Sequence, residues 1–293
     1  MKVLITGASG FTAHHLSEAL IRAGAEPNEL YFSSLSRQKP KYCENYFPCD
    51  LSQYEIVEAL IKIVKPQQIY HLAGTFSNDY AIDYRVNVLS AKNILDSLLH
   101  TGINAKVLLV GSAAEYGFVN PVDNPIPEDY PLRPVSIYGL TKAHQSQLMG
   151  YYYRVHGLNI VMARTFNLTG NGMPSSLFVG NVYEQIGKYK RREIPKIIVG
   201  NLKNMRDYID VDEAVKNYKI IMACGPAGEI YNVGSGKSIR IYDLLDQLLN
   251  DAGLDQNAVE IKDYPAGNKI DIADIYADIR KIKLLESGFS GPW

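Results

Sequence analysis

Short runs of apolar residues alternate with longer amphipathic stretches through the first half of the chain. The apolar runs have the length of buried strands and occupy residues 2–6, 30–35, 68–72, 106–111 and 159–164. Between these runs, apolar residues recur with helical spacing at 13–23, 54–64, 86–100 and 137–156. Near-continuous apolar strands that are separated by helices predict a parallel sheet covered by helices on both faces.

A parallel sheet of this kind is either an open, doubly wound sheet or a closed barrel, because its crossover connections are right-handed. A barrel needs eight strand–helix units with more even spacing than this chain offers. The glycine-rich loop that follows the first predicted strand also favours the open form. We therefore expect an α/β fold with a doubly wound parallel sheet of the Rossmann type.

The regular alternation stops near Arg164. Residues 167–176 are rich in glycine, asparagine, proline and serine, which is typical of a loop. Further helices are predicted near 177–191, 211–223 and 241–249, with a strand at 197–199 and a segment at 230–233 that can return to the main sheet. The expected organisation is a larger domain, residues 1–166 with 208–233 returning to it, and a smaller C-terminal lobe, residues 167–207 and 234–293.

The composition narrows the class of protein. Of the 293 residues, 46% are hydrophobic and 21% are charged, which is typical of a soluble globular protein. A net charge of −1 argues against nucleic-acid binding, and the aliphatic runs are far shorter than the ~20 residues of a membrane helix. Three cysteines, six histidines without metal-like spacing and an N-terminus without a signal-peptide core predict a reduced, cytoplasmic protein that holds no metal.

The first predicted strand leads directly into a glycine-rich loop with the sequence TGASGFTA. Gly7 and Gly10 leave room for backbone amides to approach a pyrophosphate, and the N-terminus of the following helix adds a partial positive charge. Ala13 occupies the third position of the fingerprint, where alanine is permitted. This order predicts a dinucleotide site that includes Gly7, Gly10, Phe11 and Thr12, with an ordinary strand–helix turn as the alternative.

The second predicted strand is followed by Arg37. An NAD-selective site places an acidic residue here for the ribose 2′-hydroxyl, and residues 30–41 contain none. The planar guanidinium of Arg37 can bind a 2′-phosphate instead, which favours NADP over NAD, although an ordinary surface arginine is also consistent. Asp50 and Leu51 follow an apolar stretch and can contact the adenine, while Asp50 can equally cap the helix predicted at 54–64.

Ser112, Tyr138 and Lys142 form the candidate catalytic group. Tyr138 and Lys142 are four residues apart in a predicted helix, so their side chains share one face. A nearby ammonium favours the tyrosinate, which predicts a lowered pKa for Tyr138 and proton exchange with a substrate oxygen during hydride transfer. The spacing alone is common by chance. Its context is more specific, because Ser112 lies at the carboxyl end of the fourth predicted strand, where α/β sheets bind ligands.

The order of these motifs resembles the extended short-chain dehydrogenase/reductase family, in the branch that modifies nucleotide sugars. The matching residues are Thr6-Gly7-x-x-Gly10-Phe11, His71-Leu72-Ala73-Gly74, Asn87, Ser112-x-x-x-Tyr116-Gly117, Tyr138-x-x-x-Lys142, Arg164-x-Phe166-Asn167 and Arg206-Asp207. Residues 199–202 and 206–207 resemble the group of GDP-mannose 4,6-dehydratase and GDP-6-deoxy-4-ketomannose reductase. Residues 164–167, 176–179 and 231–236 are most similar to the reductase.

The resemblance implies further binding residues. Leu72, Ala73 and Gly74 would line the cofactor, and Lys142 would also hold the nicotinamide ribose. The implied substrate contacts, mainly from the smaller lobe, are Ser112, Ala113, Asn167, Phe178, Val179, Asn201, Arg206 and Lys269. Among them, Asn167 and Arg206 would contact the diphosphate, and Lys269 would stand where relatives carry an arginine. Core packing is the alternative for Phe178 and Val179, and an ion pair with Asp207 or Asp210 is the alternative for Arg206.

One residue that differs from the nucleotide-sugar branch bears on the type of reaction. The dehydratases that this chain resembles carry a glutamate two residues after the catalytic hydroxyl and use it as the base at the sugar C5. Here that position is Ala114, and Glu115, one residue further on, is expected to point elsewhere. A reductase needs only a hydride, Tyr138 as the acid and Ser112 as a hydrogen-bond donor to the same oxygen.

The resemblance therefore implies an NADP-dependent reductase that acts on the 4-keto group of a GDP-4-keto-6-deoxy-sugar and gives a product of the GDP-rhamnose type. An epimerase or 4,6-dehydratase that recycles a bound cofactor is the alternative within the fold. A non-catalytic dinucleotide-binding sensor is the alternative of another class. Three consecutive tyrosines, residues 151–153, can pack against a partner helix in a homodimer or fill the core.

Overall fold

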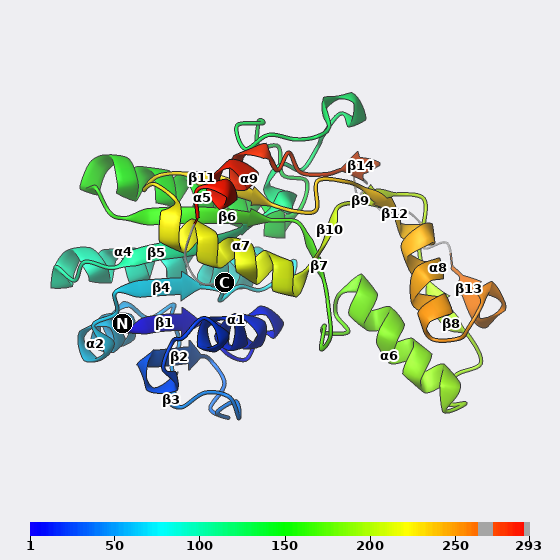
Figure 1. Ribbon diagram of the computed structural model, residues 1–293, viewed down its shortest axis with the longest axis horizontal. Helices are drawn as coiled ribbons and strands as arrows, with labels where there is room; N and C mark the ends of the chain where they lie inside the picture. The colour runs from blue at the N-terminus through cyan, green and yellow to red at the C-terminus, as the bar shows by residue number, and fades with distance from the viewer. Residues whose placement is uncertain (263–271, 290–293) are drawn as a thin grey trace.

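Seven parallel strands form the main sheet of the protein, for which the computed structural model describes residues 1–262 and 272–289 (Figure 1). In chain order the strands are β1 (Val3–Thr6), β2 (Leu30–Ser34), β3 (Asn45–Pro48), β4 (Gln68–His71), β5 (Lys106–Ser112), β6 (Ile160–Thr165) and β11 (Ile230–Val233). Their spatial order is β11-β6-β5-β4-β1-β2-β3, and the order reverses between β1 and β4. This confirms the doubly wound parallel sheet.

The register aligns the carboxyl ends of the central strands. Thr6 of β1 lies opposite Ser33 of β2 and His71 of β4. At the edge of the sheet, β11 pairs in parallel with β6, so the segment at 230–233 returns to the main sheet as expected.

Ser112 ends the fifth strand in chain order, β5, and not the fourth as predicted. The additional strand is β3, whose sequence Asn-Tyr-Phe-Pro contains no run of buried aliphatic residues. It lies at the edge of the sheet, where a proline is tolerated because the outer side of the strand needs no amide donor. Periodicity could not detect this strand because its side chains are only partly buried.

Helices cover both faces of the sheet. They are α1 (Phe11–Arg22), α2 (Tyr54–Val64), α3 (Tyr80–Asp83), α4 (Ser90–Thr101), α5 (Ile137–His156), α7 (Val211–Cys224) and α9 (Arg280–Ser287). Val3 and Ile5 of β1 belong to a core with α1 and α7, while Leu4 belongs to a second core with α2, α4 and α5. This alternation is what a strand buried on both faces requires.

The helix predicted at 86–100 begins differently from the expectation. It is preceded by α3 and by one π-helical segment, η2 (Tyr84–Leu89), and only then continues as α4. Short 3₁₀ segments connect other elements, namely η1 (Pro27–Glu29), η3 (Ala113–Glu115), η4 (Pro121–Asp123) and η5 (Gln256–Ala258).

A smaller lobe lies beyond the carboxyl ends of the strands, on the right in Figure 1. It contains α6 (Phe178–Lys190), β8 (Ile197–Val199), α8 (Ile241–Asp251) and β13 (Val259–Ile261), which enclose a separate apolar core. Short paired strands lead into it: β7 (Asn167–Thr169) with β10 (Tyr208–Asp210), and β9 (Met205–Arg206) with β12 (Ile239–Arg240) and β14 (Asp274–Ile275).

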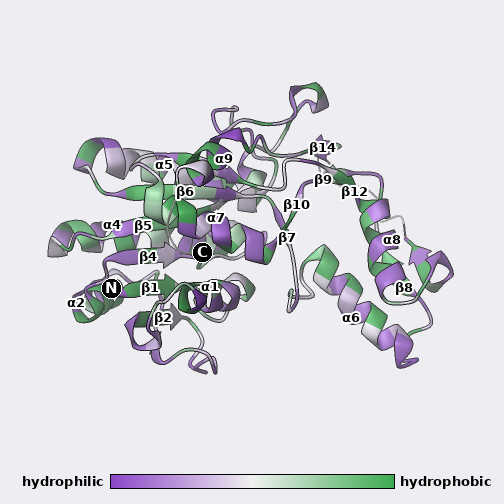
Figure 2. Cartoon of the chain, in the orientation of Figure 1, coloured by the Kyte–Doolittle hydropathy of each residue, from purple (hydrophilic) through white to green (hydrophobic). Residues whose placement is uncertain are grey.

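The distribution of hydropathy follows this architecture. Figure 2 shows apolar residues along strands such as β1 and β6, and an alternation of polar and apolar residues along α6 and α8. That alternation is typical of helices that bury one face and expose the other. Among the described residues, no helix combines the length and the apolar character that a membrane span needs.

Candidate active site

The loops after β1 and β4 meet where the strand order reverses. Gly7 follows β1 with a φ of +73°, and a β-carbon there would lie 2.8 Å from the backbone nitrogen of Ala73. The Ala73 amide donates to Thr6 Oγ1 at 3.3 Å, and Thr6 Oγ1 lies 2.9 Å from Nδ1 of the buried His71. Only glycine fits at position 7. The two main chains therefore form the crevice in which doubly wound sheets bind nucleotides.

The N-terminus of α1 opens into the same crevice. Its N-cap residue, Gly10, has no side chain that could accept from the first amides, and the first turn contains no acidic residue. Phe11 and Thr12 form that turn, two residues earlier than predicted, while Ala13 is buried beneath it. The first backbone amides and the helix dipole are thus available to an anion, so the residues present fit a dinucleotide pyrophosphate.

The candidates for the adenosine end lie after β2 and β3. Arg37 is exposed, and among the described residues it has no ion-pair partner, which leaves its guanidinium available to a phosphate. Asp50 does not cap α2, whose N-cap residue is Gln53, so that alternative is wrong. Instead Asp50 accepts from the Ser52 amide at 3.0 Å and from the Ser52 hydroxyl at 2.7 Å. Leu51 packs in the core beneath α2 and α4.

The start of α5 packs directly on the turn that follows Ser112. Ser136 caps α5 by accepting from the Gly139 amide at 3.0 Å. A β-carbon on Gly139 would lie 2.3 Å from the Ala114 carbonyl oxygen, so a larger residue would push the helix away from the turn. This close approach brings Tyr138 next to Ser112, whose side chain hydrogen-bonds it.

The pKa of Tyr138 is raised, not lowered. Burial of the phenol is the largest cause, and the carboxylates of Glu115 and Asp83 raise the pKa further. The hydrogen bond with Ser112 lowers it but does not outweigh the loss of solvent. The expectation of a lowered Tyr138 pKa is therefore wrong for this structure, because spacing in a helix does not reveal burial.

Lys142 reaches across to the loop after β4. Its Nζ donates to the Val110 carbonyl at 2.9 Å and to Gln145 Oε1 at 3.3 Å. A β-carbon on Gly74 would lie 3.3 Å from the same Nζ. Burial lowers the pKa of Lys142 to about 8, although the charge of Glu115 opposes the shift. The structure thus brings Ser112, Tyr138, Lys142 and Gly74 together at the carboxyl ends of β4 and β5.

The π-helical segment η2 ties the loop after β4 to α5. The side chain of Asn87, fully buried, accepts from the Thr75 amide at 2.8 Å and donates to the Thr75 carbonyl at 3.0 Å. It also donates to Thr141 Oγ1 at 3.0 Å, one residue before Lys142. π-helical turns are rare, and many of those known lie at functional sites.

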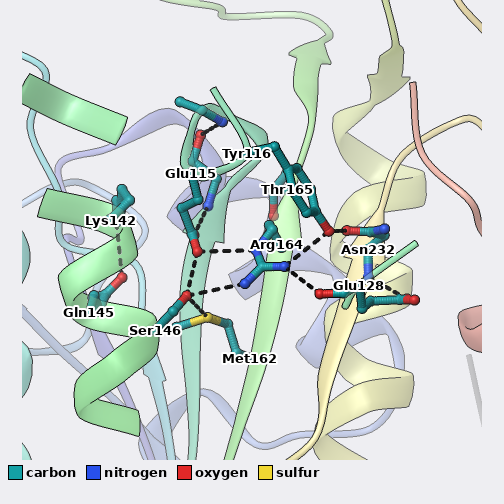
Figure 3. Close-up of polar contacts among 12 residues, drawn as sticks. Glu115, Tyr116, Glu128, Lys142, Gln145, Ser146, Met162, Arg164, Thr165 and Asn232 are labelled. Carbon is teal, nitrogen blue, oxygen red and sulfur yellow. Dashed lines mark hydrogen bonds and ion pairs between the residues drawn. The ribbon is translucent and has the colours of Figure 1, made fainter. Parts of the chain in front are cut away.

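Glu115 is fully buried, and its side chain points toward Arg164 and Ser146 (Figure 3). Its Oε1 accepts from the Ser112 amide at 2.7 Å, and its Oε2 accepts from Arg164 Nε at 3.1 Å and from the Ser146 hydroxyl. Both Glu115 and Arg164 are almost completely buried. The carboxylate therefore holds the main chain at Ser112 and one turn of α5 beyond Lys142.

Arg164 extends the buried polar network toward β11. Its Nη1 donates to the Tyr116 hydroxyl at 3.0 Å and to the Glu128 carbonyl at 3.0 Å. The Tyr116 hydroxyl in turn donates to Asn232 Oδ1 at 2.7 Å. This network was not predicted, although an arginine in a strand of buried residues needs a buried partner.

Two of the candidate substrate residues, Asn167 and Arg206, lie on the short strands β7 and β9 that lead into the lobe. Asn167 is exposed at the start of β7 and donates to the Asp207 carbonyl at 3.0 Å. Arg206, partly buried in β9, donates to the carbonyls of Met205 and Ile272. The buried Asp207 carboxylate accepts from the backbone amides of residues 235, 236 and 277.

The remaining candidates differ in exposure. Ala113 is buried beneath the turn after Ser112, and Val179 is 1% exposed in the core of the lobe, with Phe178 partly buried beside it. Asn201 is exposed, and its Oδ1 accepts from an amide two residues further on at 2.9 Å. Lys269 lies outside the described residues. Within those residues, no three His, Cys, Asp or Glu side chains are grouped as they would be around a metal ion.

Comparison with known proteins gives a family. The model of the NAD dependent epimerase/dehydratase family matches residues 3–234. The chain is 28% identical over 273 residues to GDP-6-deoxy-D-mannose reductase from Pseudomonas aeruginosa, covering 90% of this chain and 84% of the relative. It is 25% identical over 291 residues to a putative UDP-glucose 4-epimerase from Methanocaldococcus jannaschii, covering 97% and 92%.

Two solved structures share the fold. RMD from Pseudomonas aeruginosa in complex with NADPH superposes with a TM-score of 0.81 at 24% identity, covering 100% of this chain and 94% of that one. A dTDP-glucose 4,6-dehydratase from Streptomyces venezuelae with NAD bound gives a TM-score of 0.85 at 20% identity, covering 100% and 92%. The neighbours thus include binders of both nicotinamide dinucleotides.

Proposed function

Because the chain belongs to the NAD-dependent epimerase/dehydratase family of nucleotide-sugar enzymes, we propose that it reduces the 4-keto group of a GDP-4-keto-6-deoxy-sugar with NADPH. The product would be of the GDP-rhamnose type. The relative named GDP-6-deoxy-D-mannose reductase supports this choice of base and sugar. The crevice between β1 and β4 would hold the dinucleotide, and the smaller lobe would bind the sugar nucleotide.

The orientation of Glu115 carries the choice of reduction over dehydration. A dehydratase of this branch takes a proton from the sugar C5 with a glutamate at the position of Ala114. Alanine cannot act as a base, and the neighbouring Glu115 is engaged by Arg164, Ser146 and the Ser112 amide. Elimination therefore lacks its expected base, whereas reduction does not need one.

In this proposal each member of the catalytic group has one role. A bound nicotinamide dinucleotide supplies the hydride. Tyr138 gives its proton to the oxygen at sugar C4, and its raised pKa keeps the phenol protonated at neutral pH until that oxygen develops charge. Ser112 donates a hydrogen bond to the same oxygen. Lys142, next to Gly74, binds the ribose of the cofactor and orients it.

NADP is the proposed cofactor, with NAD as the alternative. Arg37 supports NADP because its exposed guanidinium follows β2, where an acidic residue would select NAD. Comparing NADPH and NADH in one assay tests this choice. A variant R37A is expected to raise KM for NADPH and to leave KM for NADH unchanged.

The experiment that tests the proposed function supplies GDP-4-keto-6-deoxymannose and NADPH. We expect one NADPH to be oxidised for each sugar nucleotide reduced, followed by absorbance and by chromatography. Conversion of a sugar nucleotide without net NADPH oxidation would identify an epimerase or dehydratase, which the full-length similarity to a putative UDP-glucose 4-epimerase keeps as the second candidate. Binding without any conversion would identify a sensor.

The nucleotide base is tested separately by thermal unfolding with GDP-, UDP-, dTDP- and CDP-sugars. A ligand at one hundred times its Kd stabilises the folded protein by about 2.7 kcal/mol. We expect the largest shift with a GDP-sugar in the presence of NADPH. A larger shift with another base would reject the GDP assignment and leave the reaction type open to the assay above.

We also propose a homodimer. The three consecutive tyrosines of α5 divide between the two expected roles: Tyr152 is 4% exposed in the core, whereas Tyr151 and Tyr153 are 48% and 40% exposed. The exposed pair supports an interface on this helix, and sedimentation of wild type and a Y151S/Y153S variant tests it. A reducing, cytoplasmic location is proposed as well, since Cys43, Cys49 and Cys224 are all free thiols.

A further inference from the structure

Phe76 is a large apolar side chain that is 65% exposed, in the loop after β4. Its ring centre lies 5.3 Å from that of Tyr138, and the two planes meet at 82° in an edge-to-face contact. Single apolar residues are common on protein surfaces, so exposure alone carries no argument. The position of Phe76 is informative, because its ring borders the phenol to which we assign proton transfer.

The main chain on both sides of Phe76 is fixed by buried side chains. Asn87 accepts from the amide of Thr75 at 2.8 Å, and Asp83 accepts from the amide of Ser77 at 2.8 Å. Asp83 also accepts from the Ser77 hydroxyl at 2.6 Å, and neither Asp83 nor Asn87 has any exposed surface. Two fully buried polar groups thus hold a short loop whose central phenyl ring remains in solvent.

This arrangement is typical of a preorganised binding residue. A flexible loop would let the phenyl ring turn inward and reduce its contact with water. Here the anchors on both sides keep the ring at the mouth of the site, where it needs no reordering when a ligand arrives.

We propose that Phe76 determines specificity by packing against the apolar side of the substrate sugar, and that it favours a methyl group at C6 over a hydroxymethyl group. The inference rests on the proposed function, because that function brings the C4 oxygen to Tyr138 and places near the neighbouring ring the carbons bonded to C4, of which C5 carries the C6 group. A phenyl ring packs well against a methyl group but offers a hydroxyl no hydrogen bond, so a buried hydroxyl there loses its water without compensation.

The reverse reaction tests the proposal with stable compounds. NADP⁺ is supplied with GDP-rhamnose, which has a methyl group at C6, or with GDP-mannose, which has a hydroxymethyl group. The variants are F76S, F76L and, as a matched control, L284S, since Leu284 is an exposed apolar residue of α9. Far-UV circular dichroism and the Kd of NADP⁺ check that each variant is folded.

For wild type we expect a preference for GDP-rhamnose. F76S is expected to lower kcat/KM for GDP-rhamnose by about ten- to a hundredfold, mainly through KM, and to change the value for GDP-mannose much less. F76L should retain most of the preference because it keeps an apolar contact, and L284S should behave as wild type. An equal loss for both sugars in F76S, or an unchanged preference, would overturn the proposal.

Binding separates this inference from the proposed reaction. If wild type oxidises neither sugar nucleotide, the proposed reductase activity fails, and calorimetry with GDP-rhamnose and with GDP alone then decides the role of Phe76. A Kd that F76S raises for GDP-rhamnose but not for GDP supports the sugar contact. Equal changes for both ligands, no change, or no binding of GDP-rhamnose to wild type overturns it.

Discussion

The candidate catalytic residues and the candidate substrate-binding residues are held in place in different ways. At the carboxyl ends of β4 and β5, buried polar partners fix the chemistry: Glu115 binds the Ser112 amide, and the Val110 carbonyl binds the Lys142 ammonium. In and around the lobe, Asn167 and Asn201 stand exposed on a short strand and a loop. Buried polar groups are costly to arrange, whereas exposed amides are not.

This difference indicates which part of the site needs precisely positioned atoms. Transfer of a hydride and a proton depends on the relative position of a few atoms, so rigid, buried supports favour it. Recognition of a nucleotide and its phosphates spreads over more contacts, and each can adapt. Substitutions at the carboxyl ends of β4 and β5 should therefore abolish turnover or destabilise the fold. Substitutions in the lobe should alter substrate affinity alone.

The largest effect is expected for Y138F. Removing the hydroxyl removes the proton donor, so kcat should fall by about 10²- to 10⁴-fold, while the Kd of NADPH stays within twofold. Absorbance of NADPH and calorimetry measure the two quantities. Tyr183, exposed on α6 of the lobe, provides the control Y183F, which should turn over at the wild-type rate. A Y138F enzyme with more than a tenth of wild-type kcat would contradict the assigned role.

The second prediction compares a buried ion pair with an exposed one. E115Q leaves the buried Arg164 without its counter-charge, and we expect the free energy of unfolding to drop by about 3–5 kcal/mol. E184Q breaks the exposed pair between Glu184 and Lys188 in the lobe and should not change stability measurably. Urea unfolding of both variants gives the values, and equal losses would remove the distinction between the two regions.

The third prediction concerns pH. The pKa of Lys142 is about 8 in the folded protein and near 10.5 in the unfolded chain, so between these values the unfolded chain binds more protons. Stability of wild type relative to K142M should therefore rise from pH 8 to pH 10.5, by up to about 3 kcal/mol. Urea unfolding at several pH values measures the difference. Two parallel stability profiles would show that this ammonium is not desolvated.

The smallest effect is expected in the lobe. N201A removes one exposed amide that we assign to substrate, and a hydrogen bond of about 0.5–1.5 kcal/mol corresponds to a rise in KM of roughly two- to tenfold. Stability should change little, because the hydrogen bond that Asn201 Oδ1 accepts from the Lys203 amide is exposed to water, and the Kd of NADPH should not change, because Asn201 lies outside the main sheet. Steady-state kinetics and thermal unfolding test both points. A loss of kcat without a change in KM would place this residue with the catalytic group.

Much of the fold follows from local pattern. The bounds of α2 and α5 agree with the predicted ranges 54–64 and 137–156, because α2 has strong helical periodicity and α5 is bounded by the N-cap Ser136 and the left-handed Gly157. β3 and the π turn at η2 were not predicted. The strand contains no buried aliphatic run because it lies at the sheet edge, and the π turn is accompanied by hydrogen bonds of Asn87 to residues on other elements, which spacing does not reveal.

Only those site residues that belong to sequence motifs in a fixed order could be predicted. Ser112, Tyr138 and Lys142 follow from motif order, and the structure brings them together. The pairing of Glu115 with Arg164 spans 49 positions and depends on β5 and β6 lying side by side, which spacing does not reveal. The direction of the Tyr138 pKa was missed for the same reason, since burial is a property of the folded chain. Phe76 stands in a loop whose anchors become visible only in three dimensions.

Isotope transfer from the cofactor to the sugar follows the proposed hydride itself. NADPH that carries deuterium at both hydrogen positions of C4 of the nicotinamide is incubated with the protein and GDP-4-keto-6-deoxymannose, and the product is analysed by mass spectrometry and NMR. We expect one deuterium at C4 of the sugar for each NADPH oxidised, and almost no labelled product with Y138F. Product without deuterium, or a labelled cofactor that remains unchanged while the sugar is converted, would contradict reduction at this site.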